Sequence, residues 1–360
     1  MAISQIAWLR LRNQRLLSRS LKRPIDVVRW FGALQSQDLA SSLYAIGLRM
    51  QCATDALVEQ ALVDKTIVRT WAMRRTIHCI PATDARWMVR LLAPRQNRRM
   101  ASYYRKAGIT HYDLERAGQV IHSALAGGKR LTRSELYGEL NAAGIATSPS
   151  AGAMRGLHIL VHWAQAGLIC LASRRGKQQT FALLEEWAPA GRDLSGRDAL
   201  TELAKRYFRS HGPATVRDFA WWTGLTVAEA RQGLRSASDF LEPLMAEGVE
   251  HWLARGVRGG AESPKSSVFL LPPFDEYTVA YADRRVAADA AMLPQIGHGI
   301  SANIIVNGRV AGTWKRTLSS NTVVITCNLL RRLTGGEQSN LNEAAQEYGR
   351  FIRRRASVST

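Results

Sequence analysis

A chain of 360 residues with 46% hydrophobic residues is long enough for two or three domains with substantial cores. Its net charge is +20, and arginine supplies 41 of the 49 basic residues, which favours a polyanionic partner and above all nucleic acid. The four cysteines are too widely spaced for zinc or a disulfide framework, and no stretch approaches ~18 consecutive apolar residues, so we expect a cytoplasmic protein without metal, cofactor or membrane contact.

Residues 5–65 are expected to be helical, with a junction between two core helices at FGALQSQDLA, residues 31–40. One apolar stripe at helical spacing precedes it: Val27, Trp30, Phe31 and Leu34. Asp38 is typical of an N-cap and predicts a second helix through about Met50. Side chains two residues apart share a face only in extended backbone. Gln35 and Gln37 can therefore serve one site only if the first helix ends near Gln35.

Two short runs, IVRTWAMR and TIHCIP, follow these helices and predict a β-hairpin that turns at Arg74 and Arg75. Helices followed by a basic hairpin have the order of a winged helix, so residues 1–93 are predicted as a first module.

Residues 94–190 repeat this order after a basic helix. Thr132 and Glu135 form a capping box that opens a helix, and a second helix follows. Two predicted strands then flank a basic turn that contains Arg174, Arg175 and Lys177.

Residues 191–360 are predicted as a third module. Helix, short helix, Gly224 turn and a helix capped by Thr226 have the order of a helix-turn-helix. Further on, Asn307-Gly308 between alternating strands predicts a hairpin with a type I′ turn. Its far strand carries three basic residues: Arg309, Lys315 and Arg316. The last helix is expected at about 338–355. The chain is thus predicted to be α+β and mainly helical, with three tandem winged-helix modules and a β-rich C-terminal portion.

Several stretches, in order from about residue 5 to 335, resemble the AlkZ/YcaQ family of winged-helix DNA glycosylases. They are LQSQD, SLYAIGLRM, TWAMRRTIHCIPATDARWM, LLPPFDEYTVAYADRR and HGISANIIVNGRVAGTWKR. The resemblance implies a C-shaped arrangement of the modules, with double-stranded DNA carrying alkylated purines as the partner. It also implies excision of N-alkylated purines, including bulky adducts and some interstrand crosslinks, in base excision repair or in self-resistance to a genotoxin.

Family members carry a catalytic Gln-x-Gln or Gln-x-Asp motif, and Gln35-Ser36-Gln37 matches the first form. Ser36 departs from the aliphatic residue that is usual at the middle position. The family also engages DNA through a C-terminal β-hairpin, for which NIIVNGRVAGTWKR is one candidate. No dimerisation element is visible, so a monomer is expected.

Glutamine suits the chemistry that this resemblance implies. Alkylation at N7 or N3 places positive charge on the purine, so the leaving group is already activated. An amide does not titrate near neutrality, but its carbonyl oxygen can hold a water and point a dipole at an oxocarbenium-like transition state. Gln35 and Gln37 are therefore predicted to position the water of a monofunctional hydrolase.

Each candidate residue also has a structural explanation. Gln35 and Gln37 could cap a helix end, and His78 could be a satisfied polar residue on a wing strand. Asp275 and Glu276, adjacent on a predicted strand, would point to opposite faces and serve structure, with Asp275 orienting the arginines of ADRR. The basic residues of the predicted wings and hairpin are expected to contact phosphates, and a solvated face is the alternative. They are Arg74, Arg75, Arg174, Arg175, Lys177, Arg309, Lys315 and Arg316.

Two other functions are compatible with the sequence. One is a non-enzymatic winged-helix DNA-binding protein or transcriptional regulator, which would show sequence preference and usually dimerise. The other is a binder that sequesters a DNA-reactive small molecule, which would bind it saturably without DNA.

Overall fold

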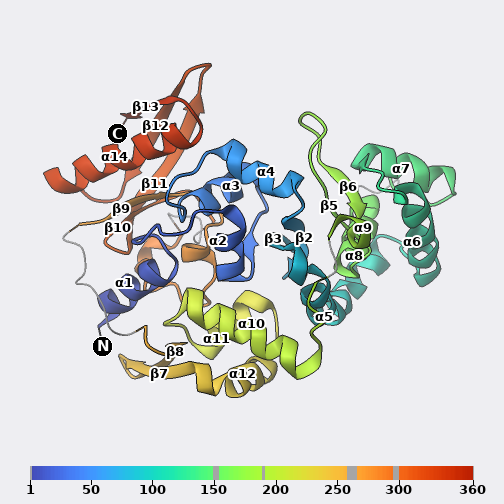
Figure 1. Cartoon of the computed structure of the whole chain (residues 1–360), viewed down its shortest axis with the longest axis horizontal. Coiled ribbons are helices and arrows are strands. Elements are labelled where there is room, and N and C mark those ends of the chain that lie inside the picture. Colours follow the sequence, from blue (N-terminus) through green and yellow to red (C-terminus); the bar gives the residue numbers. More distant parts are fainter. Residues whose placement is uncertain (1, 149–153, 189–190, 258–265, 295–299, 360) are drawn as a thin grey trace. The chain divides into compact units, whose positions relative to one another are not determined.

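The chain folds into two units, which are described separately (Figure 1). The computed structural model describes residues 2–148, 154–188, 191–257, 266–294 and 300–359. Unit 1 comprises Met1–Gln60, Thr201–Trp222 and Thr226–Thr360, and unit 2 comprises Ala61–Leu200 and Thr223–Leu225. No helix among the described residues is long and apolar enough to cross a membrane.

The N-terminal part of unit 1 is helical except for one short extended segment. Its elements are α1 Ile3–Asn13, α2 Pro24–Phe31, β1 Leu34–Gln35, α3 Leu39–Gly47 and α4 Asp55–Val63. Pro24 opens α2, and Gly32 at φ 85° ends it, because a left-handed residue cannot continue a right-handed helix. Leu34 therefore lies in extended chain, and its prediction as part of the helical stripe is wrong.

The middle of unit 1 carries three helices and a β-hairpin. They are α10 Gly196–His211, α11 Val216–Thr223, α12 Val227–Ser236, β7 Leu241–Ala246 and β8 Val249–Ala254. Thr226 and Glu229 form the predicted capping box at the start of α12. Trp222 is fully buried, whereas its neighbour Trp221 is 44% exposed.

The C-terminal part of unit 1 is a five-stranded sheet with order β13-β12-β11-β10-β9. Its elements are β9 Val268–Leu271, α13 Glu276–Val279, β10 Asn303–Val306, β11 Arg309–Leu318, β12 Thr322–Leu329, α14 Gly335–Phe351 and β13 Arg355–Ser359. Asn307 at φ 51° and Gly308 at φ 83° form the predicted turn between β10 and β11. The last helix ends earlier than predicted, because Arg353 at φ 56° turns the chain and Arg355 begins β13, which pairs in parallel with β12.

Unit 2 contains helices and a mixed-length antiparallel sheet whose strands follow the order β3-β2-β5-β6-β4. Its elements are β2 Ile67–Met73, β3 Thr76–Pro81, α5 Ala85–Lys106, α6 His111–Leu125, β4 Leu131–Thr132, α7 Arg133–Ala142, α8 Arg155–Gln165, β5 Ile169–Leu171, β6 Thr180–Leu183 and α9 Leu184–Trp187. A short 3₁₀ turn occurs in this unit at Ala82–Asp84, and unit 1 contains two others at Ser238–Phe240 and Ala290–Met292. Both hairpins predicted in this region are present, and so is the capping box of Thr132 and Glu135.

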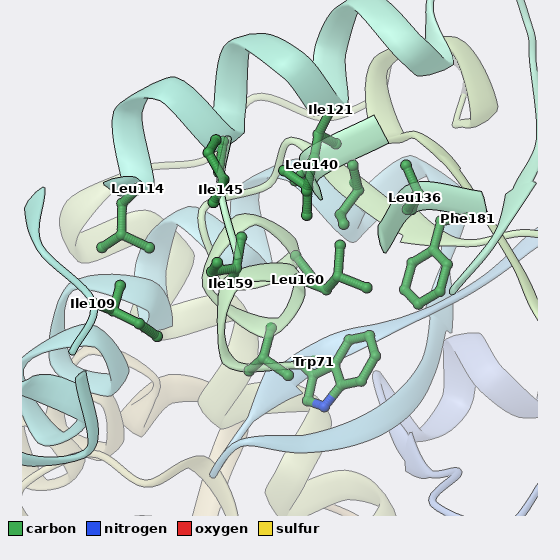
Figure 2. Packing of buried hydrophobic residues seen from close by; sticks show 14 of the residues in the cluster. Trp71, Ile109, Leu114, Ile121, Leu136, Leu140, Ile145, Ile159, Leu160 and Phe181 are labelled. Carbon is green, nitrogen blue, oxygen red and sulfur yellow. The ribbon is translucent and has the colours of Figure 1, made fainter. Parts of the chain in front are cut away.

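The core of unit 2 joins the sheet to helices α6, α7 and α8 (Figure 2). Trp71 from β2 stacks on Phe181 from β6, with ring centroids 6.4 Å apart. The helices contribute fully buried aliphatic residues, among them Ile121, Leu136 and Ile159. Burying such a side chain is worth about 1.5–3 kcal/mol, so this cluster fixes the β2–β3 and β5–β6 hairpins to the helices.

The fold is of the mixed α+β class and 48% helical, which agrees with the predicted class. The three-module division at 1–93, 94–190 and 191–360 stays a prediction, and its boundary at 190 lies outside the described residues.

Candidate active site

The Gln-Ser-Gln segment occupies the turn between α2 and α3 in unit 1. Because Gly32 ends α2 three residues earlier, Gln35 lies in the extended segment β1. Gln35 is 9% exposed, whereas Gln37 is exposed at the surface. The two amides can serve one site only if the first helix ends near Gln35. Helix α2 ends at Phe31, so this requirement is met.

Ser36 is fully buried between the two glutamines. Its hydroxyl donates to Ser42 Oγ at 2.7 Å, and the Ser42 hydroxyl donates to the carbonyl of Leu39 at 2.7 Å. Asp38 caps α3 as predicted, accepting a hydrogen bond from the backbone of Ser41 at 2.8 Å. A serine thus fits the buried middle position because α3 supplies a hydroxyl partner for it.

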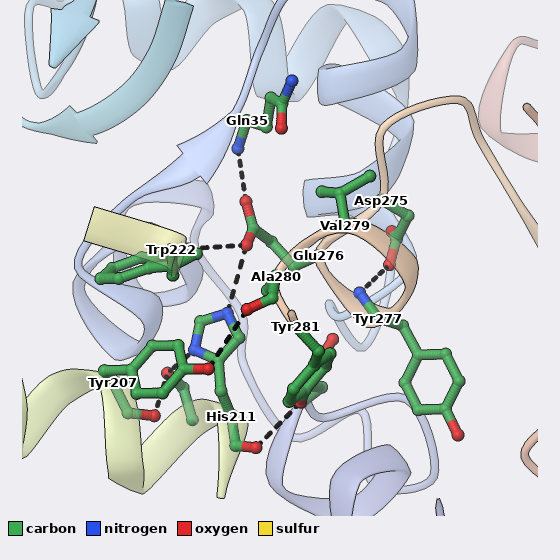
Figure 3. Close-up of polar contacts among 12 residues, drawn as sticks. Gln35, Tyr207, His211, Trp222, Asp275, Glu276, Tyr277, Val279, Ala280 and Tyr281 are labelled. Carbon is green, nitrogen blue, oxygen red and sulfur yellow. Dashed lines mark hydrogen bonds and ion pairs between the residues drawn. The ribbon is translucent and has the colours of Figure 1, made fainter. Parts of the chain in front are cut away.

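The carboxylate of Glu276 lies directly beneath Gln35 (Figure 3). The backbone N–H of Gln35 donates to Glu276 Oε1 at 2.6 Å, and the indole N–H of Trp222 donates to Oε2 at 2.9 Å. His211 Nε2 lies 3.2 Å from the same Oε2. Glu276 is 1% exposed, so hydrogen bonds to the carboxylate replace water inside unit 1. In Figure 3 the side-chain amide of Gln35 points away from this carboxylate.

His211 is enclosed by aromatic rings. Its ring stacks on Tyr207 with centroids 4.7 Å apart and meets the edge of Phe31, the last residue of α2, at 5.3 Å. Burial lowers the pKa of His211 below its ordinary value, although its hydrogen bond with Glu276 opposes the shift. The ring is therefore neutral at pH 7, and its Nε2–H donates to Glu276, since a carboxylate can only accept.

Asp275, the neighbour of Glu276, makes a buried ion pair with Arg49 in unit 1. Two guanidinium nitrogens of Arg49 lie 2.8 Å from its two oxygens, and both side chains have no exposed surface. Asp275 also caps α13 by accepting from the backbone of Tyr277. The FDEY stretch is thus a helix start rather than a strand, and Asp275 binds Arg49 rather than the arginines of ADRR.

Three of the predicted site residues lie on the β2–β3 hairpin of unit 2. Arg74 and Arg75 form its turn, with φ angles of 49° and 63°. The Arg75 guanidinium stacks on Tyr103 at 4.5 Å. His78 is fully buried, and its Nδ1 lies 2.9 Å from the carbonyl of Thr76.

The basic turn between β5 and β6 also belongs to unit 2. Arg174, Arg175 and Lys177 are all exposed there. Arg175 forms an ion pair with Glu135 at 2.7 Å, so part of its charge is already neutralised. Lys177 follows Arg175 by two residues in the same turn and is exposed.

The remaining basic candidates lie at two places along β11 in unit 1. Arg309, beside the β10–β11 turn, pairs with Asp289. Lys315 and Arg316 are exposed on the half of β11 that pairs with β12, and Arg316 also contacts the hydroxyl of Tyr348. Strand β11 therefore belongs to two hairpins, and the one it forms with β12 carries the two exposed cations.

Comparison with known proteins decides the family. A family model for DNA glycosylase AlkZ-like proteins matches residues 28–351. The chain belongs to this family. A curated relative, the interstrand DNA cross-link repair glycosylase of Streptomyces sahachiroi, is 26% identical over 321 residues, 86% of each chain. The solved structure of the Streptomyces sahachiroi DNA glycosylase AlkZ matches with a TM-score of 0.83 and 22% identity over 100% of both chains, which shows the same fold.

Membership of the AlkZ-like family confirms the resemblance seen in the sequence and makes the protein a hydrolase of N-glycosyl bonds in DNA. The matched region includes Gln35, Gln37 and Glu276, whereas α1 and β13 lie outside it.

Sequence reasoning missed the support beneath the Gln-Ser-Gln segment of this AlkZ-like protein. The sequence indicates Glu276 only as a carboxylate beside Asp275, and no sequence feature distinguishes His211. Glu276 contacts both Gln35 and His211, positions far apart in the chain, and no periodicity or local motif signals these contacts.

Proposed function

We propose that this AlkZ-like glycosylase is a monofunctional enzyme that removes N-alkylated purines, including bulky adducts, and leaves an abasic site. The name of its curated relative supports an extension to interstrand crosslinks. The observation that carries the proposal is the Gln35-Ser36-Gln37 segment, which begins in the extended segment β1 after α2 ends and carries amide groups rather than titrating groups.

The proposed mechanism assigns the water to the two amides. An alkylated purine departs readily because its ring already carries positive charge, so the enzyme needs little acid catalysis. The carbonyl oxygens of Gln35 and Gln37 hold the attacking water and point their dipoles at the cationic sugar. Because undamaged bases are poor leaving groups, such a weak catalyst spares them, and no pKa near neutrality enters the chemical step.

The proposed DNA contacts are cations on β-hairpins. In unit 1 they are Lys315 and Arg316 on the β11–β12 hairpin, which projects at the top of Figure 1. In unit 2 they are the β2–β3 and β5–β6 turns, with Arg174 and Lys177 exposed on the latter. Winged-helix modules around a concave DNA-binding face and a monomeric state complete the proposal.

The test uses three duplexes, with a single N7-methylguanine, a bulky N7-guanine adduct, or an interstrand crosslink. Each is incubated with excess enzyme, and alkali then cleaves the strand at any abasic site. We expect Gln35→Ala and Gln37→Ala to lower the single-turnover rate on the order of 10²-fold while DNA binding stays intact. Gln51→Ala removes an exposed amide from the same unit and serves as the matched control.

The outcomes separate the parts of this proposal. Cleavage that survives both substitutions would place the water elsewhere. Release of methylguanine without release of the bulky adduct would restrict the substrate class, and a crosslink that stays closed on a denaturing gel would remove unhooking from the proposal.

A further inference from the structure

The proposed catalytic segment is held by a carboxylate that accepts a hydrogen bond from its main chain. We propose that Glu276 is a positioning residue for Gln35, and that His211 and Trp222 hold Glu276 in place. This inference rests on the proposed function, because it assigns to Glu276 the task of aiming the water-holding amide.

The hydrogen bond between Gln35 and Glu276 has the properties of a strong, specific contact. The N···O distance is 2.6 Å, at the short end of the range for hydrogen bonds from a backbone amide. Gln35 follows the end of α2, so no helical carbonyl accepts from its N–H. The acceptor instead comes from α13, 241 residues later in the chain.

Two donors fix the second oxygen of the carboxylate. Trp222 Nε1–H and His211 Nε2–H both reach Oε2, at 2.9 and 3.2 Å. The His211 ring is itself held between Tyr207 and Phe31, and Phe31 ends the helix that leads into Gln35. The carboxylate and the last residue of α2 therefore both contact the same imidazole.

The ion pair of Asp275 with Arg49 anchors the start of α13. Arg49 also donates to the carbonyls of Gln14 and Ala45, so the pair ties the first turn of α13 to α1 and α3. Glu276 is the next residue after Asp275. The same ion pair therefore also helps to fix the position of the Glu276 carboxylate relative to Gln35.

Positioning matters because a misplacement of about 1 Å can cost about 10²-fold in rate. In Glu276→Gln the side-chain volume is kept, but an amide offers one acceptor oxygen instead of two. If that oxygen faces Gln35 N–H, the amide N–H₂ group faces the N–H of Trp222, which cannot change tautomer. One of the two donors must therefore lose its partner: either the Gln35 N–H loses its acceptor, or Trp222 no longer holds the side chain that Gln35 binds, and in both cases the hold on the Gln35 segment weakens.

The first experiment compares Glu276→Gln with Tyr277→Phe. The control also removes a buried hydrogen bond next to Glu276, from the Tyr277 hydroxyl to the Gly308 carbonyl at 2.7 Å, but leaves the support of Gln35 intact. We expect Glu276→Gln to lower the single-turnover rate ~10- to 100-fold with little change in DNA affinity. The control should stay within about threefold of the parent.

A double-mutant cycle separates positioning from general structural damage. If Glu276 acts through Gln35, Glu276→Gln has a smaller effect on the rate in a Gln35→Ala background, because only Gln37 is then left to be misplaced. The same loss in both backgrounds would overturn the inference, and so would a Glu276→Gln rate within threefold of the parent. Should Glu276→Gln fail to fold, Trp222→Phe keeps the carboxylate and an aromatic ring, and the same cycle applies to it.

Hydrogen exchange tests the contact without any activity. We expect faster amide exchange at residues 33–37 in Glu276→Gln, but not in Tyr277→Phe. Unchanged exchange would overturn the inference even if activity falls. If the parent releases no base from any of the three duplexes, the proposed function fails, and the exchange comparison still decides whether Glu276 holds the segment.

Discussion

At the scale of single residues, burial keeps several histidines neutral in the folded chain. It lowers the pKa of the imidazole in both units, and the residues affected are His158, His162, His211 and His251. Below the ordinary value of about 6.5 the unfolded chain binds protons that the folded chain does not. The free energy of unfolding is therefore undiminished by these histidines above pH 6.5. It falls as the pH decreases towards the pKa values of the histidines in the folded chain.

The prediction concerns the pH range from 7.5 to 5.5. Carboxylates with lowered pKa, such as Glu337 at about 2, lose their contribution only at more acidic pH. Urea unfolding should show a lower midpoint at pH 5.5 than at pH 7.5, with a smaller difference in His211→Gln than in His111→Gln, which removes an exposed imidazole. Equal midpoints at both pH values would contradict this assignment.

The candidate site was predictable at this scale only in part. The Gln-Ser-Gln motif and Asp38 could be read from the sequence, because helix caps and a short motif are local signals. Glu276 and His211 could not, because their roles depend on a contact with Gln35 that only the folded unit creates.

At the scale of elements, the β10–β11 turn packs closely against α1. A Cβ on Gly308 would lie 2.7 Å from the Cβ of Ala7 and 3.2 Å from the hydroxyl of Tyr277. The β7–β8 turn offers a comparison, because Gly248 has a similar φ of 76° but open space around it. The two glycines share a backbone requirement and differ in their surroundings.

We predict that Gly308→Ala destabilises the protein more than Gly248→Ala does. Positive φ alone costs an alanine about 1–2 kcal/mol, and the clash with α1 adds about 1–3 kcal/mol at Gly308 only. Chemical denaturation of both variants measures the difference. Equal losses would mean that α1 yields to the added methyl group without cost.

Element types were largely predictable because caps and alternating patterns act locally. Thr132, Thr226 and Asn307-Gly308 each marked a boundary that the structure bears out. Two boundaries were missed for a physical reason. Gly32 stops α2 before Leu34 although the apolar spacing continues, and the arginines from 353 onward leave α14 because β12 offers a partner for a parallel strand.

At the scale of the whole molecule, the charge of +20 sets the dependence of DNA binding on salt. We predict that affinity for undamaged duplex falls steeply with salt concentration, because binding releases counterions from phosphates. Lys177→Ala should reduce the salt slope by about 1, whereas Arg175→Ala should reduce it less, because Glu135 already pairs with Arg175. Filter binding across 50–200 mM salt measures both slopes, and equal slopes for all three proteins would remove this turn from the DNA interface.

The contact between Glu276 and Gln35 has a consequence for how this enzyme can diverge. The carboxylate accepts a hydrogen bond from the main-chain N–H at position 35, which every residue except proline can supply. The side chain at position 35 can therefore be varied while Glu276 and the residues that hold it stay unchanged. A library that varies this position alone should yield mostly folded proteins, so the proposed role of position 35 can be tested with many side chains in one scaffold.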